Sequence, residues 1–375
     1  MERWQHIFKK SLIKADQIST TFDLENGKID RVIAEYPARI NPYFVALIQK
    51  KDDPIYKQVV PDEREIYDDV GVDDPLNEEG DSPVPSIVHR YKNRALLMVT
   101  NQCAIYCRFC TRKRLAGKRP ISREMVRRGI DYIRDHEEIK DVILSGGDPL
   151  ILKDKGLEKI LERVRDIPHI EIIRIGTRVP GALPQRVTKN LCMMLKKYHP
   201  LYMNINFIHP REITKEVATA CNRLADAGIP LGSQTVLLKG INDDLETIKE
   251  LMQKLIAIRV KPYYLYQADF TRGTEHMRTT VECGLDILRG LQGHISGFAI
   301  PKFMIDLPGG GGKIALLPSD TVIEMNEVEV IVKNYQNKIY RYPQVTAEKV
   351  GYEGCLKHGD PPHSAACEYG SETRE

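Results

Sequence analysis

Strand-like and helix-like segments alternate along residues 94–269, and this alternation constrains the fold more than any other feature of the sequence. Six short apolar segments, rich in β-branched or aromatic residues, are separated by longer segments with helical patterning. Such alternation predicts βα units with parallel strands and helices that cover the sheet. The predicted strands are RALLMVT (94–100), DVILSGG (141–147), EIIRIGT (171–177), LYMNINF (201–207), PLGSQTVLL (230–238) and KPYYLYQAD (261–269).

The ends of these predicted strands favour a barrel. An open, doubly wound sheet fits the same order of elements, but even spacing and polar strand ends favour a partial (β/α)6 barrel of the TIM type. In barrels the chemistry occurs at the C-terminal ends of the strands, so we expect the active site there. Those ends read Thr100-Asn101-Gln102-Cys103, Ser145-Gly146-Gly147-Asp148, Thr177-Arg178, Asn206, Gln234 and Gln267-Ala268-Asp269.

Four regions are expected along the chain. Pro83 and Pro85 mark the first boundary, because proline biases the residue before it away from helix. The expected regions are a helical N-terminal extension (1–80), the barrel (81–300), a segment with a glycine run, a lysine and closing strands (301–343) and a tail (344–375).

Composition excludes several classes of protein. The 375 residues are 29% charged and 42% hydrophobic, which is ordinary globular usage and argues against disordered, collagen-like and membrane proteins. A net charge of +3 without long single-sign blocks predicts no nucleic-acid or membrane partner, so a small molecule is expected. The start of the chain lacks a signal-peptide pattern, which predicts a cytoplasmic protein whose eight cysteines stay reduced and available to metals.

Three of these cysteines stand together after the first predicted strand. Cys103, Cys107 and Cys110 form a CxxxCxxC pattern. Three thiolates in one loop can hold three corners of an iron–sulfur cluster and leave the fourth iron open. Zinc would require a fourth ligand, and none follows at the usual spacing. The remaining alternative is three unrelated buried thiols.

A run of four glycines precedes Lys313 in the segment PGGGGK (308–313). A nucleotide-binding P-loop is one alternative, but Pro308 and Ile314 do not match its pattern. A flexible linker is another, although apolar residues flank the run on both sides. A lysine fixed by a glycine turn suits a Schiff base with pyridoxal phosphate.

CxxxCxxC after the first strand and GGD after the second resemble the radical S-adenosylmethionine (SAM) superfamily. Together with SPVP…HRY, YQAD and PGGGGK, they resemble the lysine 2,3-aminomutase family from about residue 27 to 343. The resemblance implies a radical-SAM partial barrel with an N-terminal helical extension and a C-terminal segment that binds pyridoxal 5′-phosphate. It also implies a [4Fe–4S] cluster and S-adenosyl-L-methionine, whose cleavage gives a 5′-deoxyadenosyl radical.

The resemblance assigns roles to individual residues. Cys103, Cys107 and Cys110 would bind the cluster, Lys313 would carry pyridoxal phosphate, and Tyr266 would lie beside the reacting groups. The residues matched to S-adenosylmethionine are Gly146, Gly147, Asp148, Gln234 and Asn206. Those matched to the phosphate side of pyridoxal phosphate are Arg90, Tyr91 and Arg94, and those matched to the substrate are Arg112, Asp269 and Asp306.

Some positions depart from the family pattern. Asn206 stands where a histidine is expected, Ala268 where a cysteine is expected and Ile314 where a threonine is expected. Zinc-binding members of the family carry a cysteine near the position of Asp244 and a cysteine cluster in a longer tail. The cysteine near Asp244 is absent here. The tail could still bind zinc through Cys355, His358, His363 and Cys367.

The expected activity is an isomerase that converts L-lysine to L-β-lysine. Two aspartates suit a cationic side chain, whereas glutamate-specific relatives carry a lysine and an asparagine at these positions. Arginine, ornithine or a protein-bound lysine are alternative substrates, and a metal-binding scaffold without catalysis is the alternative from another class. A reducing electron-donor protein and a homo-oligomer are expected as partners.

Overall fold

The structure is a computed structural model, and it describes residues 2–25, 27–118, 120–318, 321–326 and 328–343. The chain divides into two units, Met1–Pro318 and Ser319–Glu375. No helix in these described ranges combines the length and the apolar character needed to cross a membrane. Outside the described residues lie the predicted zinc ligands Cys355, His358, His363 and Cys367.

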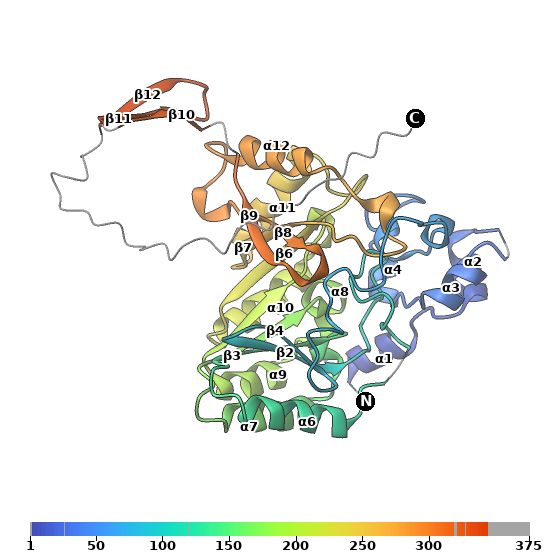
Figure 1. Cartoon of the computed structure of the whole chain (residues 1–375). Helices are drawn as coiled ribbons and strands as arrows, with labels where there is room; N and C mark the ends of the chain where they lie inside the picture. The colour runs from blue at the N-terminus through green and yellow to red at the C-terminus, as the bar shows by residue number, and fades with distance from the viewer. Residues whose placement is uncertain (1, 26, 119, 319–320, 327, 344–375) are drawn as a thin grey trace, which may run out of the picture. The chain divides into compact units, whose positions relative to one another are not determined.

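A nine-stranded sheet forms the centre of the first unit, and its strands pair in chain order from β1 to β9 (Figure 1). Neighbouring strands from β2 to β8 are parallel, whereas β1 and β9 pair antiparallel at the two edges. The strands are β1 (Ile87–Tyr91), β2 (Arg94–Thr100), β3 (Asp141–Gly146), β4 (Ile172–Thr177), β5 (Leu201–Ile205), β6 (Leu231–Leu237), β7 (Lys261–Gln267), β8 (Lys302–Leu307) and β9 (Gly312–Leu316).

This sheet confirms the predicted α/β fold of partial-barrel type. Each of the six predicted strands contains one observed strand, from β2 to β7. The structure adds a seventh parallel strand, β8, and the two edge strands do not pair with each other. The barrel is therefore open between β1 and β9.

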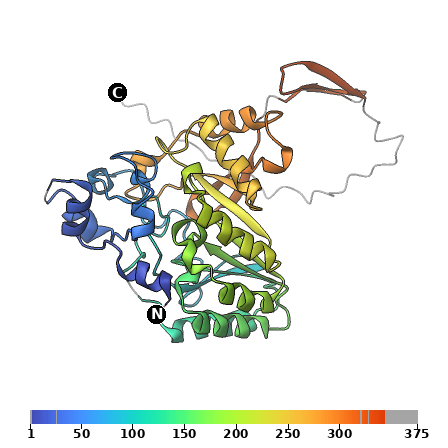
Figure 2. The ribbon, with the colours of Figure 1, turned by 180° about the vertical axis from the view of Figure 1, so that it is seen from behind.

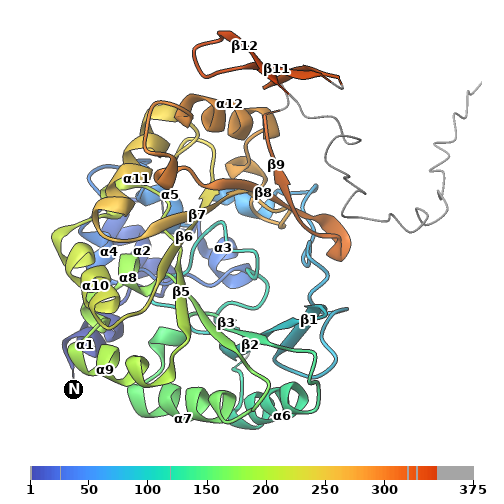
Figure 3. The same ribbon diagram turned by 90° about the vertical axis from the view of Figure 1, so that its left-hand side faces the viewer.

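Six helices alternate with the parallel strands and cover the outer face of the sheet (Figures 2 and 3). Five of them begin after a serine, threonine or aspartate whose side chain accepts a backbone N–H of the first turn, which is the usual N-terminal cap. The helices are α6 (Arg123–Arg134), α7 (Asp154–Arg165), α9 (Lys189–Leu195), α10 (Lys215–Asp226), α11 (Leu245–Ala257) and α12 (Val281–Leu291).

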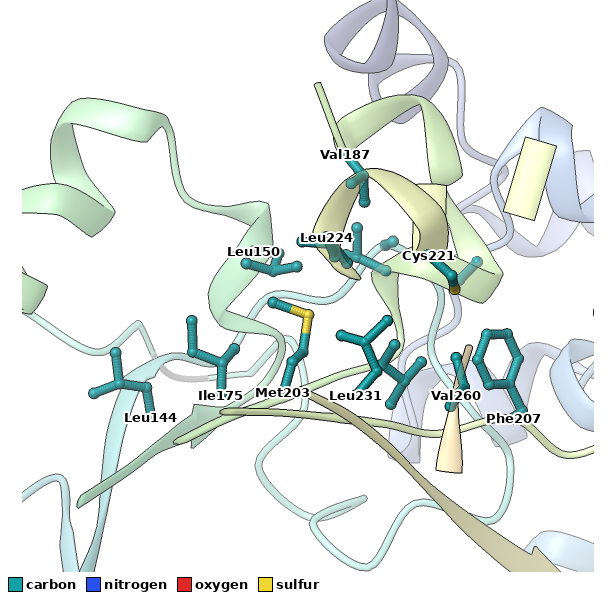
Figure 4. Close-up of a cluster of buried hydrophobic side chains, with 14 of the residues drawn as sticks. Leu144, Leu150, Ile175, Val187, Met203, Phe207, Cys221, Leu224, Leu231 and Val260 are labelled. Atoms are coloured by element: carbon teal, nitrogen blue, oxygen red, sulfur yellow. The ribbon is translucent and has the colours of Figure 1, made fainter. Parts of the chain in front are cut away.

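The hydrophobic core lies between the sheet and these helices (Figure 4). Successive residues of a strand point to opposite faces, so alternate residues such as Leu144, Ile175 and Met203 pack against the helices and are fully buried. The residues between them face the other side of the sheet and are partly buried or, like Tyr202, exposed. Ser145 and Gly176 belong to this second set, and both line the cavity described below.

The N-terminal extension packs on the loops of the barrel. Its short helices are α1 (Arg3–Lys9), α2 (Ala15–Phe22), α3 (Asp30–Glu35), α4 (Pro42–Val45) and α5 (Tyr56–Val59), and a further short helix, α8 (Val179–Ala182), follows β4. Asn41 caps α4 and donates its side-chain N–H groups to the carbonyls of Ala104 and Ala182. The extension thus contacts the loops that follow both β2 and β4.

The second unit contains a three-stranded antiparallel sheet. Its strands pair in the order β10 (Val322–Met325), β11 (Glu329–Lys333) and β12 (Ile339–Pro343). None of the described predicted site residues lies in this unit.

Candidate active site

A cavity of about 690 Å³ lies on the inner face of the partial barrel, within the usual size range for a small-molecule site. Every predicted site residue in the described part of the chain lines it. They lie in the β1–β2 hairpin, in the loop after β2, in or directly after the parallel strands β3, β5, β6, β7 and β8, and in β9. In chain order they are Arg90, Tyr91, Arg94, Cys103, Cys107, Cys110, Arg112, Gly146, Gly147, Asp148, Asn206, Gln234, Tyr266, Asp269, Asp306 and Lys313.

The cysteine loop follows β2 directly. Burial raises the pKa of Cys103, and it raises the pKa of Cys110 to about 11. The thiols of Cys103 and Cys110 are therefore protonated at neutral pH unless a metal binds them, since a metal ion deprotonates the thiol that it coordinates. Among the described residues, no group of three or more His, Cys, Asp or Glu side chains is arranged to bind a single metal ion. A cluster does not require such a group, because each of its irons binds a different cysteine.

The glycine turn after β3 packs against this loop at very close range. A side chain at Gly147 would place its Cβ 2.4 Å from the carbonyl oxygen of Gln102. Gly146 has a φ of +115°, and its Cβ would lie 2.2 Å from the carbonyl oxygen of Thr100. Only glycine fits at both positions. The SGGD segment is thus required for the two loops to touch.

Asp148 holds the next loop in place. Its buried carboxylate accepts hydrogen bonds from the Thr177 hydroxyl at 2.7 Å and from the backbone N–H of Arg178 at 2.7 Å. The N–H groups of Leu150 and Val179 donate to it as well. Both carboxylate oxygens are occupied by the chain itself, so this side chain joins the loops after β3 and β4.

Arg112 is paired with a residue that the sequence analysis did not identify. Its Nη2 lies 2.6 Å from Oε1 of Glu78, and its Nε donates to Oε2 at 2.8 Å. The Nη1 group makes only long contacts, 3.3 Å to the Ser145 hydroxyl and 3.4 Å to the Gly146 carbonyl. Glu78 belongs to the acidic stretch before the barrel, where nothing in the sequence distinguishes it from its acidic neighbours.

Two further acidic residues of the extension bind barrel loops. Glu65 is fully buried and pairs with Arg108 and Lys113, which flank the last cysteine. The carboxylate of Asp68 accepts N–H groups from Gly273 and Thr274, in the loop after β7. Because a buried charge is costly unless it is paired, Glu65 ties the extension firmly to the cysteine loop, and Asp68 ties it to the loop after β7.

Lys313 and Asp306 face each other across the β8–β9 hairpin. The Nζ group of Lys313 lies 2.6 and 2.7 Å from the two carboxylate oxygens of Asp306, because the two residues are direct partners in the antiparallel pairing. The glycine run forms the turn, in which Gly309, Gly310 and Gly312 have positive φ. Asp306 precedes Lys313 by seven residues because the two residues pair across this hairpin.

Tyrosines frame the lysine. The hydroxyl of Tyr91 accepts the backbone N–H of Lys313 at 2.9 Å, and the ring centroid of Tyr266 lies 5.6 Å from the lysine Nζ. Arg94 stacks on Tyr91 at 3.8 Å, and Arg90 is paired with Asp81 at 2.7 Å. Arg90 and Arg94 line the same cavity as Lys313.

Asp269 lies partly buried beside this pair, and its pKa is raised to about 7 by burial and by the negative charge of Asp306. The folded protein thus holds a proton on Asp269 that the unfolded chain releases above a pKa of 3.8. Stability contributed by this group is present at low pH and is lost as the pH rises towards 7.

We expect Asp269→Asn to raise the thermal midpoint of the cofactor-free protein at pH 8 by on the order of 2 °C, and to raise it by less at pH 5. At pH 8 the folded parent carries a desolvated charge that the amide removes. At pH 5 the folded parent is neutral and only part of the loss of stability is present, because the unfolded chain is ionised above its pKa of 3.8. Calorimetry at both pH values measures the difference. Asp286→Asn, which removes an exposed carboxylate from α12, is the control, and an equal gain from Asp269→Asn at both pH values would contradict the assignment.

Known proteins match most of the chain. The family model described as the radical SAM superfamily matches residues 97–255, and the one described as lysine-2,3-aminomutase matches residues 288–358. An L-lysine 2,3-aminomutase of Clostridium subterminale is 48% identical, with 90% of this chain and 81% of that protein covered. An L-lysine 2,3-aminomutase of Fusobacterium nucleatum is 45% identical, with 94% of this chain and 84% of that protein covered. A glutamate 2,3-aminomutase of Clostridioides difficile is 42% identical, with 90% and 81% covered.

Proposed function

The chain belongs to the lysine 2,3-aminomutase family of radical SAM proteins, and from this premise we propose that it is an isomerase that moves the α-amino group of L-lysine to C3, giving L-β-lysine. The observation that carries the choice of substrate is the contact between Asp306 and the ammonium group of Lys313. Asp306 is almost fully buried and already binds an alkylammonium ion through both carboxylate oxygens.

The distal ammonium of a bound lysine carries the same charge and geometry as the Lys313 side chain. When Lys313 turns to pyridoxal phosphate, Asp306 would lose its partner, and the substrate ammonium would replace it. Asp269, which interacts with Asp306, is a second acidic group beside this place. A substrate carboxylate at this place would instead meet two acidic groups.

The other end of the substrate would meet Arg112. Because Glu78 occupies the Nε side of the guanidinium, the weakly bonded Nη1 end remains for a carboxylate. A fixed guanidinium binds a carboxylate with charge-assisted hydrogen bonds and sets its orientation. Glu78 would thus position Arg112 without contacting the substrate carboxylate.

The residues present fit the cofactors of the family. The three cysteines leave no fourth ligand in their loop, as an open iron site requires. Oδ1 of Asn206, buried at the cavity wall, has no hydrogen-bond partner among the described residues, and a polar ligand would satisfy it. When bound, the [4Fe–4S] cluster with S-adenosylmethionine supplies a hydrogen-abstracting radical, and pyridoxal phosphate supplies the carbonyl group that binds the migrating amine.

The substrate proposal predicts a preference for cations. In anaerobic assays we expect turnover of lysine above arginine and ornithine, with glutamate lowest. Asp306→Asn should raise the KM for lysine about 10- to 100-fold, because a hydrogen bond to a charged group contributes about 1.5–3 kcal/mol. Identification of the β-amino acid product measures the outcome.

The controls separate the substrate site from the cofactors. Asp306→Asn should retain the iron content and the S-adenosylmethionine cleavage of the parent, and Asp226→Asn, at an exposed ion pair of α10, should leave KM unchanged. A preference for glutamate over all three cations would show the substrate assignment to be wrong.

We also propose a reducing electron-donor protein and self-association as partners. A one-electron donor is required because the radical chemistry starts from a reduced cluster. Light scattering of the full chain measures the oligomeric state.

A further inference from the structure

Arg178 is a buried arginine next to the cysteine loop, and the sequence analysis gave it no role. It follows β4, and only 8% of its surface is exposed. Its backbone N–H donates to Asp148, which places it at the junction of the loops after β3 and β4. A buried guanidinium requires partners, because removing a charge from water is costly.

Residues from several parts of the chain fix this guanidinium. Its Nη2 donates to the side-chain oxygen of Gln58 in α5 and, at 3.4 Å, to the carboxylate of Glu212. The guanidinium carbon lies 5.4 Å from the ring centroid of Phe44 and 5.3 Å from that of Phe109. Held by two polar groups and two aromatic rings, the charge has little freedom to move.

The remaining terminal group, Nη1, points at a cysteine. It lies 2.8 Å from Sγ of Cys107, the middle cysteine of the CxxxCxxC pattern. Among the described residues, no other charged side chain donates a hydrogen bond to one of the three predicted cluster ligands. The contact joins a residue after β4 to the loop after β2.

We infer that Arg178 donates this hydrogen bond to the Cys107 sulfur when that sulfur binds iron, and that it thereby raises the reduction potential of the cluster. The inference rests on the proposed function. In the step concerned, a [4Fe–4S]²⁺ cluster accepts one electron from the reducing donor protein and becomes [4Fe–4S]⁺. A nearby positive charge and an N–H···S hydrogen bond stabilise the more negative, reduced state, and both are known determinants of cluster potentials.

Redox titration followed by electron paramagnetic resonance tests the inference in the full chain, with the cluster reconstituted anaerobically and without S-adenosylmethionine. For Arg178→Gln we expect the ratio of reduced to oxidised cluster at a fixed potential to fall about tenfold, which corresponds to about 59 mV for a one-electron couple. Arg178→Lys should give a smaller shift of the same sign, because it keeps the charge but not the planar donor geometry.

Glu212→Gln provides a test of opposite sign. It removes the negative charge beside Arg178 while its amide oxygen can still accept the N–H groups of Ile208 and His209. The cluster potential should therefore rise. The matched control is Arg186→Gln, at another buried arginine, which is paired with Asp154 and donates to the carbonyls of Leu150 and Leu152; we expect no shift.

The outcomes distinguish this inference from the proposed function. If the parent protein assembles no cluster, the proposed function itself fails. If Arg178→Gln does not fold, Arg178→Lys and Glu212→Gln still decide the question, because they predict shifts of opposite sign. Potentials equal to that of the parent in variants with normal iron content would overturn the inference.

Discussion

Cys107→Ala should abolish the reductive cleavage of S-adenosylmethionine. Three cysteines leave one iron open, whereas two would leave a second iron without a protein ligand. We expect release of 5′-deoxyadenosine to fall by several orders of magnitude, as happens when one member of a catalytic unit is removed. Chromatography of the anaerobically reconstituted, dithionite-reduced protein measures the product.

The control for this experiment is another cysteine of the chain. Cys283 lies in α12, where its thiol donates to the carbonyl of Asp243, so Cys283→Ala should retain iron, sulfide and activity. Release of 5′-deoxyadenosine at the parent rate by Cys107→Ala would show that the cysteine triplet is not the cluster site. Equal losses in the two variants would indicate general damage to the fold.

Lys313→Arg should eliminate covalent attachment of pyridoxal phosphate and reduce aminomutase turnover by several orders of magnitude. Arginine keeps a positive charge opposite Asp306, so the β8–β9 hairpin retains its ion pair, but a guanidinium does not form a Schiff base under these conditions. Borohydride reduction and peptide mapping of the parent should locate the pyridoxyl group on Lys313.

Lys302→Arg is the matched control, since Lys302 is an exposed lysine at the start of the same strand β8. It should keep both the label on Lys313 and the parent turnover. The assignment of Lys313 is wrong if the label is found on another lysine of the parent, or if Lys313→Arg retains it. Iron content and S-adenosylmethionine binding should be unaffected in both variants, which separates this result from loss of the cluster.

The fold was largely predictable because its signals are local. Strand segments of β-branched and aromatic residues alternate with amphipathic helices, and each observed strand from β2 to β7 lies within its predicted segment. The sequence predicted the seventh strand, β8, only as one of the closing strands expected in the segment 301–343. Helix α12 separates β8 from β7, but β8 leads directly into a hairpin with β9, so the alternation of strand and helix ends there.

The candidate site was predictable where a short segment carries the chemistry. CxxxCxxC, SGGD and PGGGGK each place a reactive or permissive set of residues within a few positions of one another, and barrel topology brings strand ends together. All the predicted residues in the described part of the chain line one cavity as a result. Their individual roles stay predictions until the experiments above are done.

The sequence by itself determined the order of elements, the cysteine spacing and the glycine turn, because these depend on neighbours along the chain. Only the tertiary structure decided the partners of the buried charges. Glu78 meets Arg112, and Arg178 meets Cys107, across long separations in the chain. No periodicity encodes such pairs, since they depend on which loops the packed sheet and the N-terminal extension bring into contact, and on the cost of leaving a buried charge without a partner.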